Sequence, residues 1–327
     1  MSAMMKTLDR AFALEAVRVT EAAAVAAAGL VGRGDEHAAD RAAVEAMRAA
    51  FNVLPIDGTV VIGEGERDEA PMLFIGEKVG SGGVQVDIAL DPLEGTTLTA
   101  KALPNALAVM AIAEPGTLLN APDTYMDKIA IGPGYDEGLI DLDAEPGDNI
   151  KALARAKGVK TRDITALVLD RPRHAHIIEG VRRTGAAVRL ITDGDVAGVI
   201  ATSDPSTGID IYIGQGGAPE GVLAAAALRC VGGQIQTRLV FRNDEEKTRA
   251  RRLGITDFRR KYNLHDLASG DVIFAATGVT DGSMLSGVHR RGGMIETESV
   301  VMRSATGTVR WVKARHKSSR HPRANAD

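Results

Sequence analysis

Asp91 and Glu94 stand three residues apart in the segment DPLEGT (residues 91–96) and are the first candidates for chemistry. The preceding residues 84–90 alternate apolar and polar side chains, which is the period of a β-strand. Pro92 cannot donate a hydrogen bond within a sheet, so we expect the strand to end there. The next residues indicate a helix start, whose free N–H groups and Thr96 hydroxyl could bind an anion. Such a strand end could hold cations beside a phosphate, although a turn with solvated acids is the alternative.

Further acids follow a short β-branched strand predicted at residues 59–62. The loop GEGERDE (residues 63–69) contains Glu64 and Asp68, and its glycines let the backbone turn sharply while presenting carboxylates in one direction. A solvated acidic loop is the alternative, but the position directly after a hydrophobic strand favours a functional role. Asp40 lies four residues before Val44, on the apolar stripe of a predicted helix. A carboxylate there needs a partner, and a helix cap and a metal ligand remain equally open.

The segment GQGGAPEG (residues 214–221) joins a predicted strand to a predicted helix. Pro219 suits the first helical position, and Glu220 lies in the first turn. Gly214 and Gly216 resemble the start of a dinucleotide-binding motif. However, Pro219 occupies the place of the third glycine, and no acidic residue follows on a second strand. The pattern therefore disfavours a nicotinamide cofactor.

Two arginines flank Pro172 before another predicted helix. Arg171 and Arg173 both oppose the helix dipole, so an anion or an acid must lie near them. The acids Asp193 and Asp195 follow the next predicted strand. They are either ordinary turn residues or acceptors for sugar hydroxyls.

The remaining periodicity alternates strands with helices, which indicates an α/β architecture. Strands are predicted at residues 106–113, 138–143, 164–169, 187–191, 209–213, 272–276, 297–302 and 308–312, the last two as a hairpin. Helices are predicted at residues 7–28, 38–51, 149–157, 175–184 and 219–230. We expect one domain over residues 1–312, with a metal-site half over about 1–160 and a substrate-site half over about 161–312. The basic residues 313–327 are predicted to be a disordered tail.

Composition excludes several classes of protein. The net charge of −4 and the 3% aromatic content argue against a nucleic-acid partner. No apolar run is long enough to span a membrane, and the first residues contain no long apolar segment typical of a secretory signal, so we expect a cytoplasmic protein. Cys230, the one cysteine, excludes an internal disulfide and is predicted to be buried. The charged residues 242–261 are predicted to be a solvated helix and loop, and His174 and His176 to be surface residues.

Residues 91–96 resemble the D-P-x-D/E-G-T/S motif of the metal-dependent sugar and inositol phosphatase superfamily. Together with GEGE (residues 63–66) and GGAPEG (residues 216–221), they make the chain resemble the class II fructose-1,6-bisphosphatases from about Arg18 to about Arg303. The resemblance implies a layered α-β-α-β-α sandwich with mixed sheets. It also implies hydrolysis of fructose 1,6-bisphosphate to fructose 6-phosphate and phosphate, by a homo-oligomer that is a dimer or a tetramer.

The same resemblance implies the roles of individual residues. The implied metal ligands are Asp40, Glu64, Asp91, Glu94 and Glu220. The implied substrate contacts are Glu94, Gly95, Thr96, Tyr125, Arg171, Pro172, Arg173, Asp193, Gly194, Asp195 and Gly217. Thr96 would orient or activate the attacking water, and Asp68 is the candidate base. Five carboxylates in one pocket need cations, and an all-oxygen ligand set favours Mg²⁺ or Mn²⁺.

One position departs from the family pattern, since Glu36 stands where many class II enzymes have a lysine. The alternatives are a sedoheptulose-1,7-bisphosphatase, an enzyme acting on both sugars, and a non-catalytic sensor of sugar phosphates or nucleotides. The complete set of acids together with Thr96 argues against a sensor. An inositol-type monophosphatase is disfavoured by the closing GGAPEG motif.

Overall fold

The computed structural model describes residues 8–65 and 72–317, which form two compact units. Unit 1 comprises residues 1–118 and 270–327, and unit 2 comprises residues 119–269. The chain thus leaves unit 1 after Leu118 and returns to it at Gly270. Thr161, where we expected the two halves to meet, lies inside unit 2.

Unit 1 contains an eight-stranded mixed sheet with the order β12-β13-β11-β4-β3-β1-β2, and β14 also pairs with β13. Its strands are β1 (Ile56–Ile62), β2 (Lys78–Val79), β3 (Val84–Glu94), β4 (Leu107–Ala113), β11 (Val272–Gly278), β12 (His289–Arg291), β13 (Met294–Arg303) and β14 (Thr308–Lys317). The pair β1 and β3 is parallel, whereas β3, β4, β11 and β13 are successively antiparallel. Both faces of β4 and β11 are buried, which explains their continuous apolar sequences.

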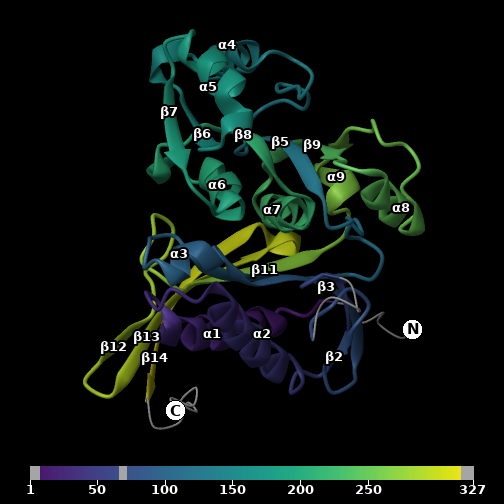
Figure 1. The fold of residues 1–327 in the computed structure, drawn as a ribbon, viewed down its shortest axis with the longest axis vertical. Helices are drawn as coiled ribbons and strands as arrows, with labels where there is room; N and C mark the ends of the chain where they lie inside the picture. The colour runs from purple at the N-terminus through teal and green to yellow at the C-terminus, as the bar shows by residue number, and fades with distance from the viewer. Residues whose placement is uncertain (1–7, 66–71, 318–327) are drawn as a thin grey trace. The chain divides into compact units, whose positions relative to one another are not determined.

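Two helices cover this sheet, as Figure 1 shows for the purple segments beneath β3 and β11. The helices of unit 1 are α1 (Phe12–Ala27), α2 (Glu36–Phe51) and the short α3 (Thr96–Ala100). The alanine-rich α1 packs on β11 and β13, because its small side chains let the backbone approach the sheet closely. Val44, Met47 and Phe51 of α2 enter the same core, as their helical spacing predicts.

Unit 2 contains a six-stranded mixed sheet with the order β10-β9-β5-β8-β6-β7. Its strands are β5 (Tyr125–Ile131), β6 (Thr165–Leu169), β7 (Ala187–Ile191), β8 (Ile211–Gly217), β9 (Gln234–Val240) and β10 (Tyr262–Asn263). Its helices are α4 (Pro146–Lys157), α5 (Ala175–Arg182), α6 (Asp195–Ile200), α7 (Ala218–Val231), α8 (Asp244–Arg252) and α9 (Leu264–Leu267). One face packs on α4 and α5 in an apolar core, and α6 and α7 contact the sheet on the other face (Figure 1).

The predicted fold class is confirmed, because both units are α/β with mixed sheets. Unit 1 supplies a helical layer and a sheet, and unit 2 supplies a sheet between two helical layers. The parallel sheet of a Rossmann fold is excluded by the antiparallel pairs at the centre of each sheet. The buried position predicted for Cys230 is also confirmed.

Two predicted strand ends are wrong. β3 continues past Pro92 to Glu94, and the register shifts so that Asp91 pairs with Val109 while Glu94 pairs with Leu107. This irregularity is a bulge. It places Pro92, which has no N–H, at a position where no hydrogen bond to the neighbouring strand is required. Similarly, β8 does not break at Gly214 but continues to Gly217.

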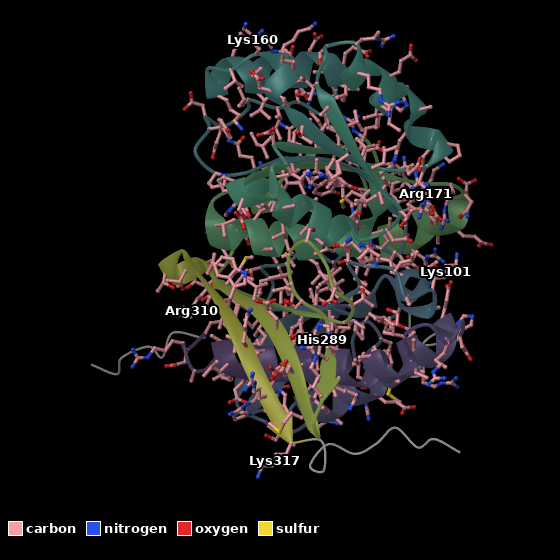
Figure 2. The ribbon with its side chains drawn as sticks, turned by 90° about the vertical axis from the view of Figure 1, so that its left-hand side faces the viewer. Lys101, Lys160, Arg171, His289, Arg310 and Lys317 are labelled. Carbon is pink, nitrogen blue, oxygen red and sulfur yellow. The ribbon has the colours of Figure 1, made fainter. Side chains whose placement is uncertain are left out.

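The prediction of a disordered tail from residue 313 is wrong in part. β14 pairs with β13 from Thr308 to Lys317, and Figure 2 shows this strand between the labels of Arg310 and Lys317. The hairpin is confirmed, and residues 318–327 lie outside the described residues. The strand predicted at residues 138–143 is also wrong, since that segment is a series of turns.

Candidate functional site

The acids of unit 1 follow neighbouring strands of its sheet. β1 and β3 are parallel, and Ile62 pairs with Ala89. Glu64 and Asp91 each come two residues later, so both lie toward the carboxyl ends of this parallel pair, Glu64 just after β1 and Asp91 still within β3. Asp91 Oδ1 accepts a hydrogen bond from the Leu93 N–H at 3.0 Å, which stabilises the turn at the bulge.

The end of β3 leads directly into a helix, as the sequence predicted. Glu94 is buried, and Gly95 has φ +92°, a left-handed conformation that favours glycine. Thr96 is then the first residue of α3 and is partly exposed. A Cβ on Gly95 would press against the Leu98 side chain, so the turn needs this glycine for space as well as for conformation.

Asp40 lies in the second turn of α2. The N-cap of that helix is Asp35, whose Oδ1 accepts from the Ala38 N–H at 2.9 Å, so the structure excludes Asp40 as the cap. Burial raises the pKa of the Asp40 carboxyl, and the positive charge of nearby His37 offsets this in part. Because α2 contacts both α3 and β3, the elements that carry Asp40, Asp91 and Thr96 pack together.

Glu36, the departure from the family pattern, lies in the first turn of α2. A negative charge there is favoured by the helix dipole. The loop before it is fastened to α3, since the N–H groups of Gly32 and Gly34 donate to the carbonyls of Thr99 and Ala100.

The metal site of unit 1 stays a prediction. Within residues 8–65 and 72–317, no three or more His, Cys, Asp or Glu side chains gather in an arrangement that could hold a metal ion. Asp68, the candidate base, lies outside the described residues.

In unit 2 the structure brings several predicted residues together at the pairing of β5 with β8. Tyr125 pairs with Gly217, and the Ala218 N–H donates to the Thr124 carbonyl at 2.8 Å. Glu220, in the first turn of α7, folds its carboxylate back onto Gly217 so closely that a Cβ there would overlap with it. Gly216 and Gly217 therefore leave space for the carboxylates of Asp195 and Glu220, and the strand continues through both glycines.

The chain's own cations compensate the Glu220 carboxylate of unit 2 only in part. Its Oε2 is buried and accepts no hydrogen bond within the described part of the chain. Burial raises the pKa of the Glu220 carboxyl, the charge of Asp195 raises it further, and Lys128 lowers it. A buried carboxylate oxygen in this state is suited to binding a cation.

Sequence reasoning missed Lys128, which lies in the middle of β5. Its side chain is 1% exposed, and its Nζ donates to Asp195 Oδ2 at 2.5 Å. Asp195 opens α6 after Gly194, which has φ +89°. Met126 and Ala130 share a strand face with Lys128, so a lone charge at an apolar position was the signal available in the sequence.

The two predicted phosphate-binding arginines differ in their partners. Arg171 Nη2 donates to Asp193 Oδ1 at 2.7 Å, which joins two predicted substrate contacts. Arg173 Nη2 donates to the Gln215 carbonyl at 2.7 Å, and its guanidinium carbon lies 5.0 Å from the centroid of the Tyr125 ring. Such a cation–π contact orients the guanidinium without neutralising it.

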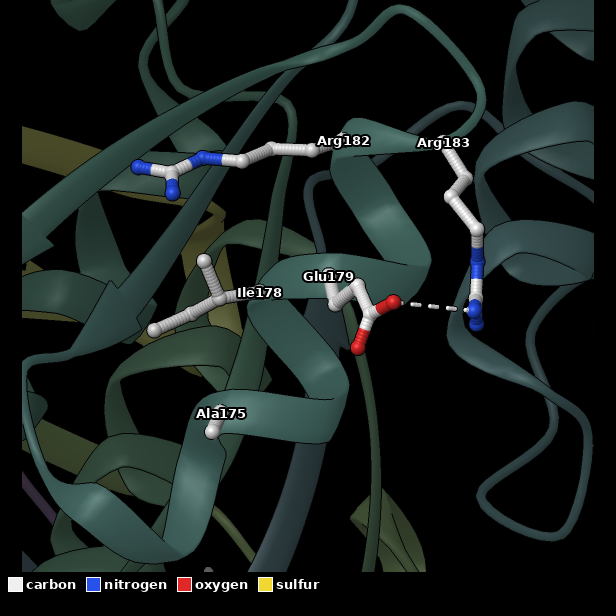
Figure 3. A pocket seen from close by; sticks show the side chains of 5 residues that line it. All are labelled: Ala175, Ile178, Glu179, Arg182 and Arg183. Atoms are coloured by element: carbon white, nitrogen blue, oxygen red, sulfur yellow. Dashed lines mark hydrogen bonds and ion pairs between the residues drawn. The ribbon is translucent and has the colours of Figure 1, made fainter.

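Neither arginine pairs with Glu179 of the neighbouring helix α5. Figure 3 shows Glu179 bonded instead to Arg183, at 3.3 Å. Both belong to a surface depression on α5, lined also by Ala175, Ile178 and Arg182. None of these five residues was predicted to bind substrate or metal.

The prediction that His174 is a surface residue is wrong. It is 1% exposed, at the end of the short 3₁₀-helix Pro172–His174. Its Nδ1 donates to the Leu169 carbonyl at 2.7 Å, and its Nε2 accepts from the Gln215 N–H at 2.9 Å. His174 thus fixes the arginine-bearing loop to β6 and β8. Burial lowers the pKa of His174, although its bond to Leu169 offsets part of that effect.

Comparison with known proteins agrees with these features. The family described as bacterial fructose-1,6-bisphosphatase, glpX-encoded, matches residues 10–316. The chain belongs to this family. It is 45% identical over 324 residues to "Fructose-1,6-bisphosphatase 1 class 2" of Escherichia coli (strain K12), which covers 94% of this chain and 96% of that protein. "Fructose-1,6-bisphosphatase class 2" of Shigella flexneri matches with the same identity and coverage.

The resemblance to class II fructose-1,6-bisphosphatases that we inferred from the motifs is therefore confirmed over almost the whole chain. It includes both units, since residues 10–316 begin and end in unit 1 and contain all of unit 2. No helix among residues 8–65 and 72–317 is long and apolar enough to cross a membrane.

Proposed function

We propose that this chain hydrolyses fructose 1,6-bisphosphate to fructose 6-phosphate and phosphate, a reaction of gluconeogenesis in the cytoplasm. Relatives 45% identical over nearly their whole length carry the name fructose-1,6-bisphosphatase class 2. The observation that carries the proposal is the neighbourhood of Tyr125 and Gly217, where Arg173 contacts the ring and Glu220 contacts the glycine. A guanidinium for one phosphate and a carboxylate for a metal ion beside the other suit a substrate with two phosphates.

The proposed reaction is metal-dependent, with Mn²⁺ or Mg²⁺ as the cofactor. The proposed ligands are Asp40, Glu64, Asp91, Glu94 and Glu220. Their donors are all carboxylate oxygens, which suit hard divalent cations, and the buried Glu220 Oε2 fits this role. When bound, the metal ions would neutralise phosphoryl oxygens and stabilise the leaving alkoxide.

The proposed roles of the chain's own groups follow from their positions. The Thr96 hydroxyl, at the start of α3, would orient the attacking water beside Glu94 and Gly95. Asp68 remains the proposed base that accepts the proton of that water.

The sugar and its second phosphate would be bound by unit 2. Because Lys128 occupies Oδ2 of Asp195, the other oxygen of that carboxylate is proposed to accept from a sugar hydroxyl. Asp193 would do the same while holding Arg171 in place. The remaining proposed contacts are Tyr125, Pro172, Arg173, Gly194 and Gly217.

Phosphate release by the full chain tests the proposal. We expect release from fructose 1,6-bisphosphate with Mn²⁺ or Mg²⁺, and none after metal is stripped and chelator is added in excess. The panel includes sedoheptulose 1,7-bisphosphate, fructose 1-phosphate and inositol monophosphate. Binding of fructose 1,6-bisphosphate without turnover under every metal condition would identify a sensor and contradict the proposal.

We also propose a homo-oligomer, either a dimer or a tetramer, as the resemblance implies. Sedimentation equilibrium on the full chain measures the mass directly. A mass equal to the 34.3 kDa of one chain, at every concentration, would contradict this expectation.

A further inference from the structure

Arg242 contacts a predicted substrate residue, although the sequence placed it in a solvated charged segment. It follows β9, and its guanidinium carbon lies 4.9 Å from the centroid of the Tyr125 ring. The guanidinium of Arg173 lies 5.0 Å from the same centroid. One aromatic ring in unit 2 is therefore shared by two guanidinium groups that come from segments about seventy residues apart in the sequence.

Arg242 is held in this position by a buried carboxylate. Glu246 is 1% exposed, and its Oε1 accepts from Arg242 Nε at 2.6 Å and from Nη2 at 2.5 Å. Its Oε2 accepts from the Arg242 N–H at 2.7 Å and from Thr124 Oγ1 at 2.8 Å. Because Thr124 directly precedes Tyr125, the same carboxylate fixes both the arginine and the strand that carries the ring.

The free end of this arginine faces solvent. The Arg242 side chain is 55% exposed, and Glu246 engages Nε and Nη2. In the part of the chain that the structure describes, no acceptor hydrogen-bonds Nη1. A planar guanidinium held by two of its nitrogens offers the third to an incoming oxyanion in a fixed orientation.

The two guanidinium groups beside the Tyr125 ring differ in how their charge is compensated. Glu246 compensates Arg242, whereas Arg173 forms no ion pair among the described residues and donates only to a carbonyl. A phosphate dianion at the edge of the Tyr125 ring, within reach of both arginines, would supply negative charge to Arg173 and an acceptor to Arg242. Aromatic contacts keep both groups in place without consuming their charge.

We propose that Arg242 binds, together with Arg173, the phosphate of the sugar bisphosphate that is not hydrolysed, and so determines the preference for bisphosphates over monophosphates. This inference rests on the proposed function and adds a residue to the substrate site. Tyr125 serves as the shared platform, and Glu246 is a positioning residue that fixes the angle of the guanidinium.

Arg242→Met tests the inference, since methionine keeps an unbranched apolar side chain over the ring and removes the charge. We expect KM for fructose 1,6-bisphosphate to rise by about fivefold to tenfold, less than for an arginine without an acid partner, because Glu246 already shares the Arg242 charge. The kcat should stay within about twofold, as should both constants for fructose 1-phosphate, which lacks the second phosphate. Equal losses on the two substrates would overturn the proposal.

A binding measurement separates this inference from the proposed reaction. Fructose 6-phosphate retains the phosphate in question, and its affinity can be measured by calorimetry without turnover. We expect Arg242→Met to weaken it by a similar factor, and Arg242→Lys to weaken it less, because the charge remains but the fork is lost. Unchanged affinity in both variants would overturn the inference even if the wild-type enzyme hydrolyses the bisphosphate. Absence of hydrolysis by the wild type would instead contradict the proposed function.

Arg260 offers a matched control within the same unit. It lies 4.9 Å from the Tyr262 ring centroid, pairs with Asp266 at 2.6 Å, and is 51% exposed. Arg260→Met thus removes the same kind of cation–π contact and ion pair at a place with no predicted substrate role. It should leave KM and the affinity for fructose 6-phosphate unchanged. A purely structural role for Arg242 predicts that both variants lower Tm alike and that neither changes KM selectively.

Discussion

The predicted site acids of the two units differ in their partners. In unit 2, Asp195 pairs with Lys128 and Asp193 with Arg171, whereas the acids that unit 1 pairs with cations, such as Glu77 with Arg48, lie outside the predicted site. In unit 1, Asp40 is partly buried on α2, and the charged neighbour that acts on it is His37. Burial that nearby positive charge offsets only in part raises a carboxyl pKa, as it does for Asp40 in unit 1 and for Glu220 in unit 2.

This difference separates structural acids from those that need a cation from outside. A carboxylate that forms an ion pair with a Lys or Arg of the chain is already charge-compensated in the metal-free protein, and it can orient neighbouring polar groups. A buried carboxylate without such a partner destabilises the apo protein until a metal ion binds, so metal affinity and stability are linked. The same reasoning applies to cations, where Arg173 has no acid partner among the described residues while Arg171 has one.

The largest expected effect concerns the buried pair of unit 2. Lys128→Met leaves Asp195 as an uncompensated buried carboxylate, and we expect the free energy of unfolding to fall by about 3–5 kcal/mol. Urea denaturation measures this loss. Lys151→Met, which breaks an exposed pair with Asp148, should cost less than about 1 kcal/mol. Similar costs for the two variants would contradict the distinction between paired buried acids and surface ones.

The next largest effect concerns Glu220, whose buried Oε2 we propose binds a metal ion. Glu220→Gln should lower metal-dependent turnover about a hundredfold, equivalent to about 2.7 kcal/mol in activation free energy. Without metal the variant should be at least as stable as the wild type, because the raised pKa of Glu220 means that its ionised form is disfavoured in the folded state.

A thermal shift with Mn²⁺ or Mg²⁺ provides a readout that does not depend on turnover. The cation should raise the Tm of the wild type more than that of Glu220→Gln. If the two proteins gain equally and turnover is unchanged, Glu220 is only a favourable charge at the start of α7.

Arg171 and Arg173 allow the same comparison for positive charges, because Arg171 pairs with an acid and Arg173, among the described residues, does not. Arg173→Ala should raise KM for the bisphosphate by about tenfold to a hundredfold, as one charged hydrogen bond is lost. Arg171→Ala should raise it less, because Asp193 already shares the Arg171 charge. Steady-state kinetics on fructose 1,6-bisphosphate and fructose 1-phosphate measure the ratio. Equal proportional losses on both substrates would show that neither arginine distinguishes the second phosphate.

Much of the fold could be predicted because its signals are local. The alternation before Asp91, the alanine-rich first helix and the helix start at Thr96 all follow from neighbouring residues. The errors arose where tertiary contacts decide. Pro92 is accommodated by a bulge, and the apolar alternation at residues 138–143 belongs to turns whose Ile140 side chain enters the core of unit 2.

The sequence predicted the motifs of the site but not the side-chain contacts between distant segments. Residue types and a family resemblance pointed to Glu220 and Arg173, yet neither spacing nor composition showed that Lys128 would meet Asp195. That pairing joins β5 to the start of α6, 67 residues later. The Tyr125 ring and Arg242 likewise meet only through the pairing of β5 with β9.

The smallest effect concerns His174, which is buried in unit 2 without an acid as hydrogen-bond partner. Its pKa is lowered by burial, so the unfolded chain binds a proton more readily than the folded protein below the ordinary value of 6.5. The contribution of His174 to stability is therefore complete above that pH and is lost as the pH falls below it. Between pH 6.5 and about 5.5 we expect the free energy of unfolding to fall, by at most the roughly 1.4 kcal/mol that one proton contributes over one pH unit.

Urea denaturation across this range, for wild type and His174→Asn, isolates the contribution, because the titrating carboxylates are common to both proteins. The variant should be less stable overall, since asparagine cannot bridge Leu169 and Gln215 as the ring does, but its stability should fall less with decreasing pH. His176→Asn, at an exposed position on α5, should keep the wild-type slope. If the slopes of wild type and His174→Asn coincide, His174 is protonated as readily in the folded protein as in the unfolded chain. The loop that carries Arg173 would then tolerate a charged imidazolium beside it, and unit 2 would hold an additional cation next to the arginine that we propose binds phosphate.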